Sequence, residues 1–366
     1  MTINRIFFLS WFLVGLIGFT FGQTKTSIPL FVGTYTGEGS EGIYRCWLDT
    51  VNGKLSAPEL ATKLENPSYL AISSDNRFLW AVGEMNKTYC LSAFSIDDKA
   101  FLQPINSQSG EGSYSCYISE LQPLKWLGAA SYGSGLVTLY PLNTDGSIGP
   151  LATVDKHWGR MPHAHCILPD PNRQFIYSAD LGIDKILIYK IEEGHLAPFG
   201  EISLPKGSGP RHIDFHPSGK WMALASELKS TVTVIARDTT RAFGKVAFQS
   251  RMLPVSFKGI SWAADIHFSP DGRFLYASNR GHNSIVIYSF NNETGTLKTI
   301  GWATAGINRP RNFTIDPSGK FLLVANQDGN DVVVFRRNVQ TGRLSPLSEK
   351  IAISHPVCLK FFNRKK

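Results

Sequence analysis

A segment of about 18 residues recurs along the chain, and this repeat constrains the fold more than any other feature. Each copy has an alternating stretch, a tight turn such as Pro-Ser-Gly-Lys or Pro-Asp-Gly-Arg, and a second apolar stretch. Copies occupy residues 67–84, 115–132, 164–181, 210–227, 264–280 and 310–327, and residues 356–362 form half a copy. Successive starts therefore lie 46 to 54 residues apart. A fixed period of this length indicates stacked supersecondary units, with propeller blades as the first candidate.

The residues after each copy complete a unit of four strands. A third apolar stretch follows, such as "KILIYKI", "TVTVIA", "SIVIYSF" or "DVVVFRR", and then a Gly-containing turn and a fourth stretch. Four short strands at this period are typical of one blade of antiparallel sheet. Together with 33 glycines, 20 prolines and 43% hydrophobic residues, the pattern predicts an all-β chain with a large core.

The count of copies predicts seven blades in one domain, residues 23–366. Six copies are complete, and the seventh is divided between the two ends of the chain. The N-terminal stretches "IPLFVGTYTG", "GIYRCWLD" and "GKLSAP" supply three strands, and "PVCLKFF" near the C-terminus supplies the missing innermost strand. We therefore expect a seven-bladed β-propeller that is closed by pairing of N- and C-terminal strands, because closure removes the open sheet edges.

The register of the repeat places certain residues at one mouth of the central channel. In a hairpin, the residue that starts the first strand and the residue that ends the second lie on the same face of the ring, opposite the turn. At the first position the copies carry Ser68, Cys116, His165, Arg211, Ala264 and Arg311. At the second they carry Glu84, Tyr132, Leu181, Glu227, Arg280 and Gln327. Variable polar residues on a repeated frame indicate function.

The variable positions contain an unusual number of cationic side chains. Arginines at three of them, with His165 and Glu227, would repel one another unless an anionic partner is bound, and arginine matches carboxylate or phosphate geometry. A simple rim salt bridge between Arg211 and Glu227 remains the alternative. Second-tier candidates for substrate contact are the neighbouring residues His163, His212, Asp265 and His267, together with Glu84 and Gln327. The histidines are spread over several blades without matching carboxylates, so we expect neither a metal nor another cofactor.

The N-terminus has the pattern of a signal peptide. "MTINR" is a short basic start, and Ile6–Phe21 is an apolar run that is shorter than the about 20 residues of a membrane span. Thr20 and Gly22 are small residues before a possible cleavage site at Gln23. We expect residues 1–22 to be removed and the mature protein to be periplasmic or extracellular, without stable membrane insertion. An uncleaved anchor is the alternative.

The cysteines and the net charge point to no further chemistry. The five cysteines are odd in number, far apart and without CxxC spacing, which argues against a zinc site or a disulfide framework, although one disulfide remains possible. Part of the net charge of +8 comes from Lys or Arg beside the repeated turns and from the basic C-terminus. No nucleic-acid-binding signature is present, so we expect no such partner.

The chain resembles the seven-bladed β-propeller lactonases, a family that includes propeller-type 6-phosphogluconolactonase and the fungal carboxy-muconate lactonizing enzyme. The resemblance rests on "PHAH" with "SADLGIDKI", "GPRHIDFHPSGK" with Glu227, "ADIHFSPDGRFLYASNR" and "PRNFTIDPSGKFLLVANQ", and it covers the whole mature chain. It implies a catalytic set of His165, Arg211, Glu227 and Arg280, with His163 competing with His165. It also implies reversible lactone chemistry on a small anionic lactone or sugar acid.

Lactone hydrolysis needs a base for water and donors for the developing oxyanion. The resemblance implies His165 or Glu227 as general acid/base, Arg211 and Arg280 as anion-binding residues, and Arg311 in support. Export does not suit a lactone made inside cells, so a non-catalytic propeller that binds an acidic sugar, glycan or protein remains an alternative. The sequence leaves open which lactone is used, the direction of reaction and the oligomeric state.

Overall fold

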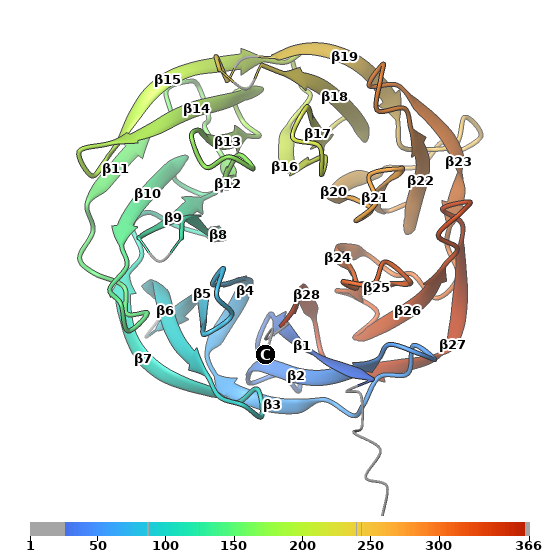
Figure 1. Ribbon diagram of the computed structural model, residues 1–366, viewed down its shortest axis with the longest axis horizontal. Coiled ribbons are helices and arrows are strands. Elements are labelled where there is room, and N and C mark those ends of the chain that lie inside the picture. The colour runs from blue at the N-terminus through green and yellow to red at the C-terminus, as the bar shows by residue number, and fades with distance from the viewer. Residues whose placement is uncertain (1–25, 86–87, 124, 239, 243, 363–366) are drawn as a thin grey trace, which may run out of the picture.

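The computed structural model describes residues 26–85, 88–123, 125–238, 240–242 and 244–362. These residues form seven four-stranded antiparallel sheets arranged as a ring around a central channel (Figure 1). The all-β, seven-bladed prediction is confirmed. The predicted signal peptide, residues 1–22, lies outside the described residues. The part of the chain that the structure describes contains no apolar helix of membrane-spanning length.

The innermost strand of each blade is the first strand of a sequence copy, as the repeat predicts. We number the blades 1 to 7 in the order of these strands: β4 (Glu65–Ile72), β8 (Ser115–Gln122), β12 (Ala164–Pro169), β16 (Pro210–Phe215), β20 (Trp262–Phe268), β24 (Pro310–Ile315) and β28 (Pro356–Phe361). Each innermost strand contacts the next around the channel, and β28 contacts both β24 and β4.

The second and third strands carry most of the core. The second strands, in blade order, are β5 (Phe78–Met85), β9 (Trp126–Ser131), β13 (Ile176–Asp180), β17 (Trp221–Ser226), β21 (Phe274–Arg280), β25 (Phe321–Asn326) and β1 (Ser27–Thr34). The third are β6 (Thr88–Ile96), β10 (Leu136–Pro141), β14 (Lys185–Glu192), β18 (Thr231–Arg237), β22 (Ser284–Phe290), β26 (Asp331–Arg337) and β2 (Gly42–Asp49). Many of them are continuous apolar runs because each blade is covered by a neighbour on both faces.

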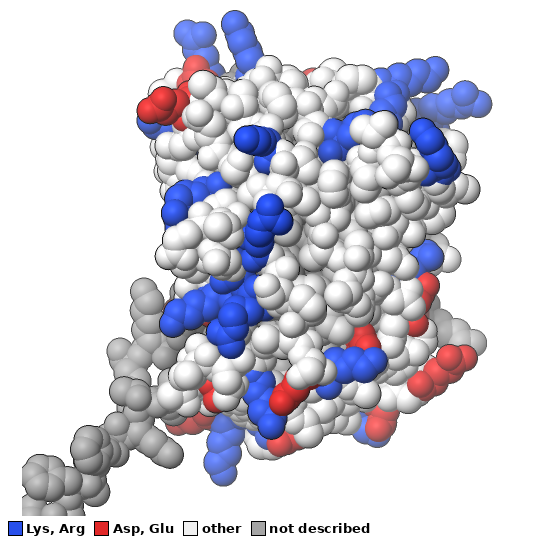
Figure 2. Space-filling model, turned by 90° about the vertical axis from the view of Figure 1, so that its right-hand side faces the viewer, with Lys and Arg blue, Asp and Glu red and all other residues white. Residues whose placement is uncertain are grey.

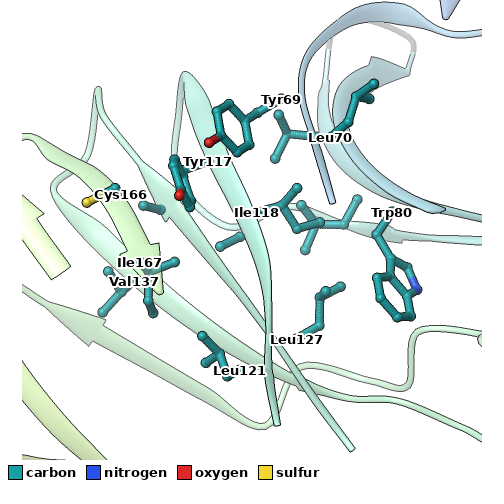
Figure 3. Packing of buried hydrophobic residues seen from close by; sticks show 14 of the residues in the cluster. Tyr69, Leu70, Trp80, Tyr117, Ile118, Leu121, Leu127, Val137, Cys166 and Ile167 are labelled. Carbon is teal, nitrogen blue, oxygen red and sulfur yellow. The ribbon is translucent and has the colours of Figure 1, made fainter. Parts of the chain in front are cut away.

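The outermost strands are much more exposed: β7 (Leu102–Ser109), β11 (Thr153–Lys156), β15 (His195–Ser203), β19 (Gly244–Arg251), β23 (Leu297–Ala303), β27 (Leu344–Ala352) and β3 (Glu59–Lys63). Figure 3 shows how neighbouring blades pack, with Leu70 and Trp80 of blade 1 facing Ile118 and Leu127 of blade 2. The core is therefore a series of apolar layers between blades, and it holds the innermost strands in fixed positions.

The seventh blade is assembled from the two ends of the described chain, as the split copy predicts. Strand β28 pairs antiparallel with β1, with Leu359 opposite Val32, and β1 pairs in turn with β2 (Figure 1). Val357, Cys358 and Leu359 are at most 2% exposed. Ring closure thus depends on six residues close to the C-terminus.

The basic residues are dispersed on the side of the molecule that Figure 2 shows. Lysine and arginine side chains are spread over this whole side, and acidic side chains lie mainly toward its lower part (Figure 2). The net charge of +8 is therefore shared among many separate surface positions on this side.

Candidate active site

A β-bulge begins the innermost strand of every blade. In blade 4, Pro210 pairs with Ser226 and His212 pairs with Ala225, so Arg211 is an extra residue without a partner in the register. A register shift occurs at the corresponding point of the other six blades, by two residues in blade 1 and by one in the rest. The single extra residues of blades 2, 3, 6 and 7 are Cys116, His165, Arg311 and Val357. Bulges re-aim side chains next to active sites. The variable position of the sequence repeat is therefore a bulge position that faces the channel mouth.

The pair Arg211 and Glu227 lies on the face predicted from the register, opposite the Pro-Ser-Gly-Lys turn. Arg211 Nε lies 2.9 Å from Glu227 Oε2, and Arg280 Nη2 lies 2.8 Å from the same oxygen. Gly209 helps to position them: it adopts a left-handed φ of 63°, and its carbonyl accepts the Glu227 N–H at 2.7 Å. The Glu227 carboxylate therefore joins two guanidinium groups, one from its own hairpin in blade 4 and one from the next hairpin in blade 5.

Both guanidinium groups are further fixed by backbone carbonyls. Arg211 Nη1 donates to Ala264 O at 2.6 Å, and Arg280 Nη2 donates to Ala263 O at 3.0 Å. Arg211 is 1% exposed and Arg280 is 6% exposed. Burial and the other arginines lower the pKa of both side chains, and Glu227 opposes this shift. The alternative interpretation, a solvent-exposed rim salt bridge between Arg211 and Glu227, does not describe this buried arrangement.

The mouth of the channel holds a cavity of about 350 Å³. Five of the residues selected from the sequence line it: Glu84, His165, Glu227, Arg280 and Arg311. Arg211 lies behind Glu227, against β20. The cavity volume falls within the range of natural small-molecule sites.

Arg311 differs from the other two arginines because no carboxylate in the described part of the chain is paired with it. Among the described residues it forms no ion pair, and its guanidinium carbon lies 5.5 Å from the centre of the Tyr35 ring. With the buried Arg211 counted, this side of the cavity thus has three arginines, and Glu227 is the carboxylate paired with two of them. A cation that faces a cavity without a partner is the group best placed to receive an anion from a ligand.

His165 lies in the cavity wall as a neutral imidazole. It is 5% exposed, and its ring is 5.4 Å from the His212 ring and 5.5 Å from the Tyr132 ring. Burial, Arg211, His212 and Arg311 together lower the pKa of His165 well below its ordinary value of 6.5. At neutral pH the ring therefore carries a free lone pair that can accept a proton.

His163 does not reach the cavity. It lies just before β12, where its ring stacks on Tyr132 with 4.4 Å between ring centres, and its Nδ1–H donates to the Tyr132 carbonyl at 2.8 Å. The bulge at His165 breaks the two-residue alternation that would have put both rings on the same side. The structure therefore brings His165, and not His163, to the predicted site.

His212, Asp265 and His267 lie beneath the cavity and do not line it. Arg211 Nη1 donates to His212 Nε2 at 3.2 Å, and His212 Nδ1–H donates to Asp265 Oδ1 at 2.8 Å. His267 Nε2–H donates to Asp265 Oδ2 at 3.0 Å, and His267 belongs to a separate hollow beside the turns of the opposite face. Asp265 and His267 are alternate residues of β20 and lie further down the channel. The three residues thus form a chain of hydrogen bonds that supports Arg211 from below.

Gln327 also lies outside the cavity wall, after the end of β25. The cavity wall also contains six residues that were not expected from the sequence: Tyr35, Asn66, Gly83, Tyr89, Tyr114 and Ser115. Ser68, Cys116 and Tyr132 also line it, and they occupy the variable repeat positions without having been assigned a role. Register alone could have selected these three residues. Gly83 and Ser115 lie within copies of the repeat, next to the variable positions, whereas Tyr35, Tyr89 and Tyr114 lie outside the copies.

The cysteines offer no alternative nucleophile at neutral pH. All five are free thiols, and four are buried. Cys116 lines the cavity with its Sγ 3.8 Å from His165 Nδ1, but burial raises the pKa of this thiol to about 11.

Within the described residues, no three His, Cys, Asp or Glu side chains form a cluster able to hold a metal.

Comparisons with known proteins agree with this architecture. Residues 29–361 match the family model "Lactonase, 7-bladed beta-propeller". A 6-phosphogluconolactonase of Bacillus subtilis is 34% identical over 342 residues, which cover 91% of this chain and 98% of the relative.

Solved structures extend the comparison. The periplasmic gluconolactonase of Pseudomonas aeruginosa superposes with a TM-score of 0.88 at 28% identity, covering 93% of this chain and all of the other. A Bacteroides fragilis protein superposes with a TM-score of 0.87 at 33% identity, covering 93% and 99% of the two chains.

Proposed function

The chain belongs to the seven-bladed β-propeller lactonase family, and on this premise we propose that it is an exported lactonase that opens, or reversibly closes, the ring of a sugar-acid or organic-acid lactone. The observation that carries the proposal is the cavity itself. One wall presents a neutral histidine, a carboxylate and two arginines, and one of these arginines has no anionic partner among the described residues. This set supplies a proton acceptor and a site for negative charge.

His165 is the proposed general base. It takes a proton from water as the water oxygen attacks the lactone carbonyl carbon, and a tetrahedral oxyanion forms. Arg280 and Arg311 are the proposed donors to this oxyanion and to the product carboxylate. When the bond from the former carbonyl carbon to the ring oxygen breaks, the protonated His165 returns its proton to that oxygen. The products are a carboxylate and a hydroxyl group on one open chain, and one proton is released.

Glu227 is the proposed organiser of the wall. Both arginine contacts use Oε2, so Oε1 has no ion pair among the described residues. We assign Oε1 to orienting the attacking water. This division of roles differs from the one that the resemblance implies, because Arg211 is buried behind Glu227. Arg311, which has no ion pair within the described residues, takes its place as an anion-binding residue.

Arg311→Ala tests the proposal. The variant should lower kcat/KM for a hydrolysed lactone by roughly 10- to 150-fold, because the oxyanion would lose a hydrogen bond to a charged group, which is worth about 1.5–3 kcal/mol. Ring opening of glucono-δ-lactone and 6-phosphoglucono-δ-lactone is followed by proton release, with spontaneous hydrolysis subtracted. Arg309→Ala is the control. The Arg309 side chain is exposed and lies 3.5 Å from Asp328 outside the cavity wall, so this variant should behave as the wild type. A protein that binds gluconate but opens neither lactone would instead be a binding module.

Export is the second part of the proposal. It is supported by the apolar run Ile6–Phe21 and by the periplasmic location of the Pseudomonas relative. Protein purified from its native host should have an intact mass that corresponds to a chain beginning at Gln23. A mature protein that retains Met1, or one recovered from the cytoplasm, would contradict this prediction.

A further inference from the structure

The wall of the cavity is contributed by all seven blades, and it is divided chemically into two halves. Blades 3 to 6 supply His165, Glu227, Arg280 and Arg311, which we call the arginine half. Blades 7, 1 and 2 supply the tyrosine half, which consists of Tyr35, Asn66, Glu84, Tyr89 and Tyr114. The arginine half contains the groups that the proposed reaction uses. The tyrosine half therefore faces the part of the substrate that does not react.

The tyrosine half is aromatic and lacks positive charge. No lysine or arginine of blades 7, 1 or 2 is among the described residues that line the cavity, and Glu84 adds a carboxylate. Tyr89 and Tyr114 lie with their ring centres 5.6 Å apart, and Tyr114 is 65% exposed. A phosphate group placed here would face a like charge without a cation to offset it. The tyrosine half therefore disfavours an anionic substituent, and an uncharged group avoids this repulsion.

Polar groups in the tyrosine half favour a sugar over a plain hydrocarbon. Glu84 Oε1 accepts a hydrogen bond from Asn66 Nδ2 at 3.1 Å and has further acceptor capacity for hydroxyl groups. Ligand sites typically combine aromatic side chains with a few polar groups that fix orientation. A sugar ring fits this combination because its C–H face can contact a tyrosine while its hydroxyls meet the carboxylate.

A ligand must lie across the mouth rather than along the channel. Beneath the cavity, the rings of Tyr69 and Tyr117 are stacked with 4.1 Å between centres, and the His212 ring meets both edge-on. These three side chains are at most 8% exposed and fill the channel at this level. A substrate whose carbonyl lies in the arginine half therefore extends toward the tyrosine half or out of the mouth, and not down the channel.

From this division we propose that the substrate is the lactone of a disaccharide acid, in which an uncharged second sugar ring occupies the tyrosine half. This inference rests on the proposed lactonase function and names its substrate class. The proposed substrate differs from the phosphorylated monosaccharide lactone in the name of the Bacillus relative. The end of the cavity that lacks a cation, rather than the reacting end, determines the choice.

The test compares three lactones: cellobiono-δ-lactone, glucono-δ-lactone and 6-phosphoglucono-δ-lactone. We expect kcat/KM for the disaccharide lactone to exceed that for each of the others by about tenfold, the order expected for one aromatic contact. Tyr114→Ala should remove this advantage and leave kcat/KM for glucono-δ-lactone within about threefold. Trp158→Ala is the control, because Trp158 is 85% exposed and is not part of the cavity wall.

Glu84→Lys provides a second, gain-of-function measurement. It places a cation in the tyrosine half and should raise kcat/KM for the phosphorylated lactone by about tenfold while lowering that for the disaccharide lactone. Hydrolysis of all three lactones at equal efficiency, or a preference of the wild type for the phosphorylated one, would overturn the disaccharide proposal but leave the lactonase function intact. Failure to open any lactone would instead overturn the proposed function.

Discussion

His165→Gln should lower kcat for lactone opening by roughly 10²- to 10⁴-fold with little change in KM, because the variant removes the proposed proton acceptor and keeps a polar side chain of similar reach. The measurement is steady-state ring opening at pH 7 on the best lactone of the panel. Burial and the neighbouring Arg211 lower the pKa of His165, so the reactive neutral form should persist well below pH 6.5. Wild-type kcat/KM should fall only as the pH drops through that lowered pKa.

The pH profile distinguishes His165 from Glu227 as the base. If His165 takes the proton, the acid limb of the profile should disappear in His165→Gln together with most of the activity. An acid limb that persists unchanged in this variant would assign the base to Glu227. His163→Gln is the matched control, since His163 contacts Tyr132 outside the cavity and should affect kcat by only a few fold. A larger loss in His163→Gln than in His165→Gln would contradict the assignment.

Deletion of residues 356–366 should abolish folding to a stable monomer. The deletion removes β28, exposes one edge of β1 and opens the ring. It also removes the buried side chains of Val357, Leu359 and Phe362, each worth about 1.5–3 kcal/mol on burial, from a fold whose total stability is expected to be about 5–15 kcal/mol. Asn312 Oδ1 would further lose the Leu359 N–H that it accepts at 2.7 Å.

Thermal unfolding and size-exclusion chromatography check this prediction. The control is deletion of residues 364–366, which keeps the whole of β28 and should leave Tm close to that of the full chain. Leu359→Ala gives a graded measurement if the deletion yields only insoluble protein. It should lower the free energy of unfolding by about 2–5 kcal/mol, as for other buried Leu→Ala changes. A monomeric deletion variant with unchanged Tm would show that closure by β28 does not stabilise the ring.

The periodicity of the sequence determined the architecture. The spacing of the copies specified the blades, and the half copy at residues 356–362 specified how the ring closes, because alternation and turn residues are local properties of the chain. Hairpin register also placed Arg211 and Glu227 on one face, since the start of one strand and the end of the next are opposite each other in any hairpin. These inferences needed no knowledge of how the blades pack.

Only the tertiary structure decided which of the selected residues meet. The bulge at His165 separated it from His163, and a bulge is a local backbone shift that the sequence pattern does not reveal. The pairing of Glu227 with Arg280, and the unpaired state of Arg311 among the described residues, depend on distances between different blades. The tyrosine half consists of residues between Tyr35 and Tyr114, in the N-terminal third of the chain. Across the cavity it faces Arg280 and Arg311, which come from the C-terminal third. Strand alternation defines one blade at a time, whereas the chemistry of this cavity arises from the ring as a whole.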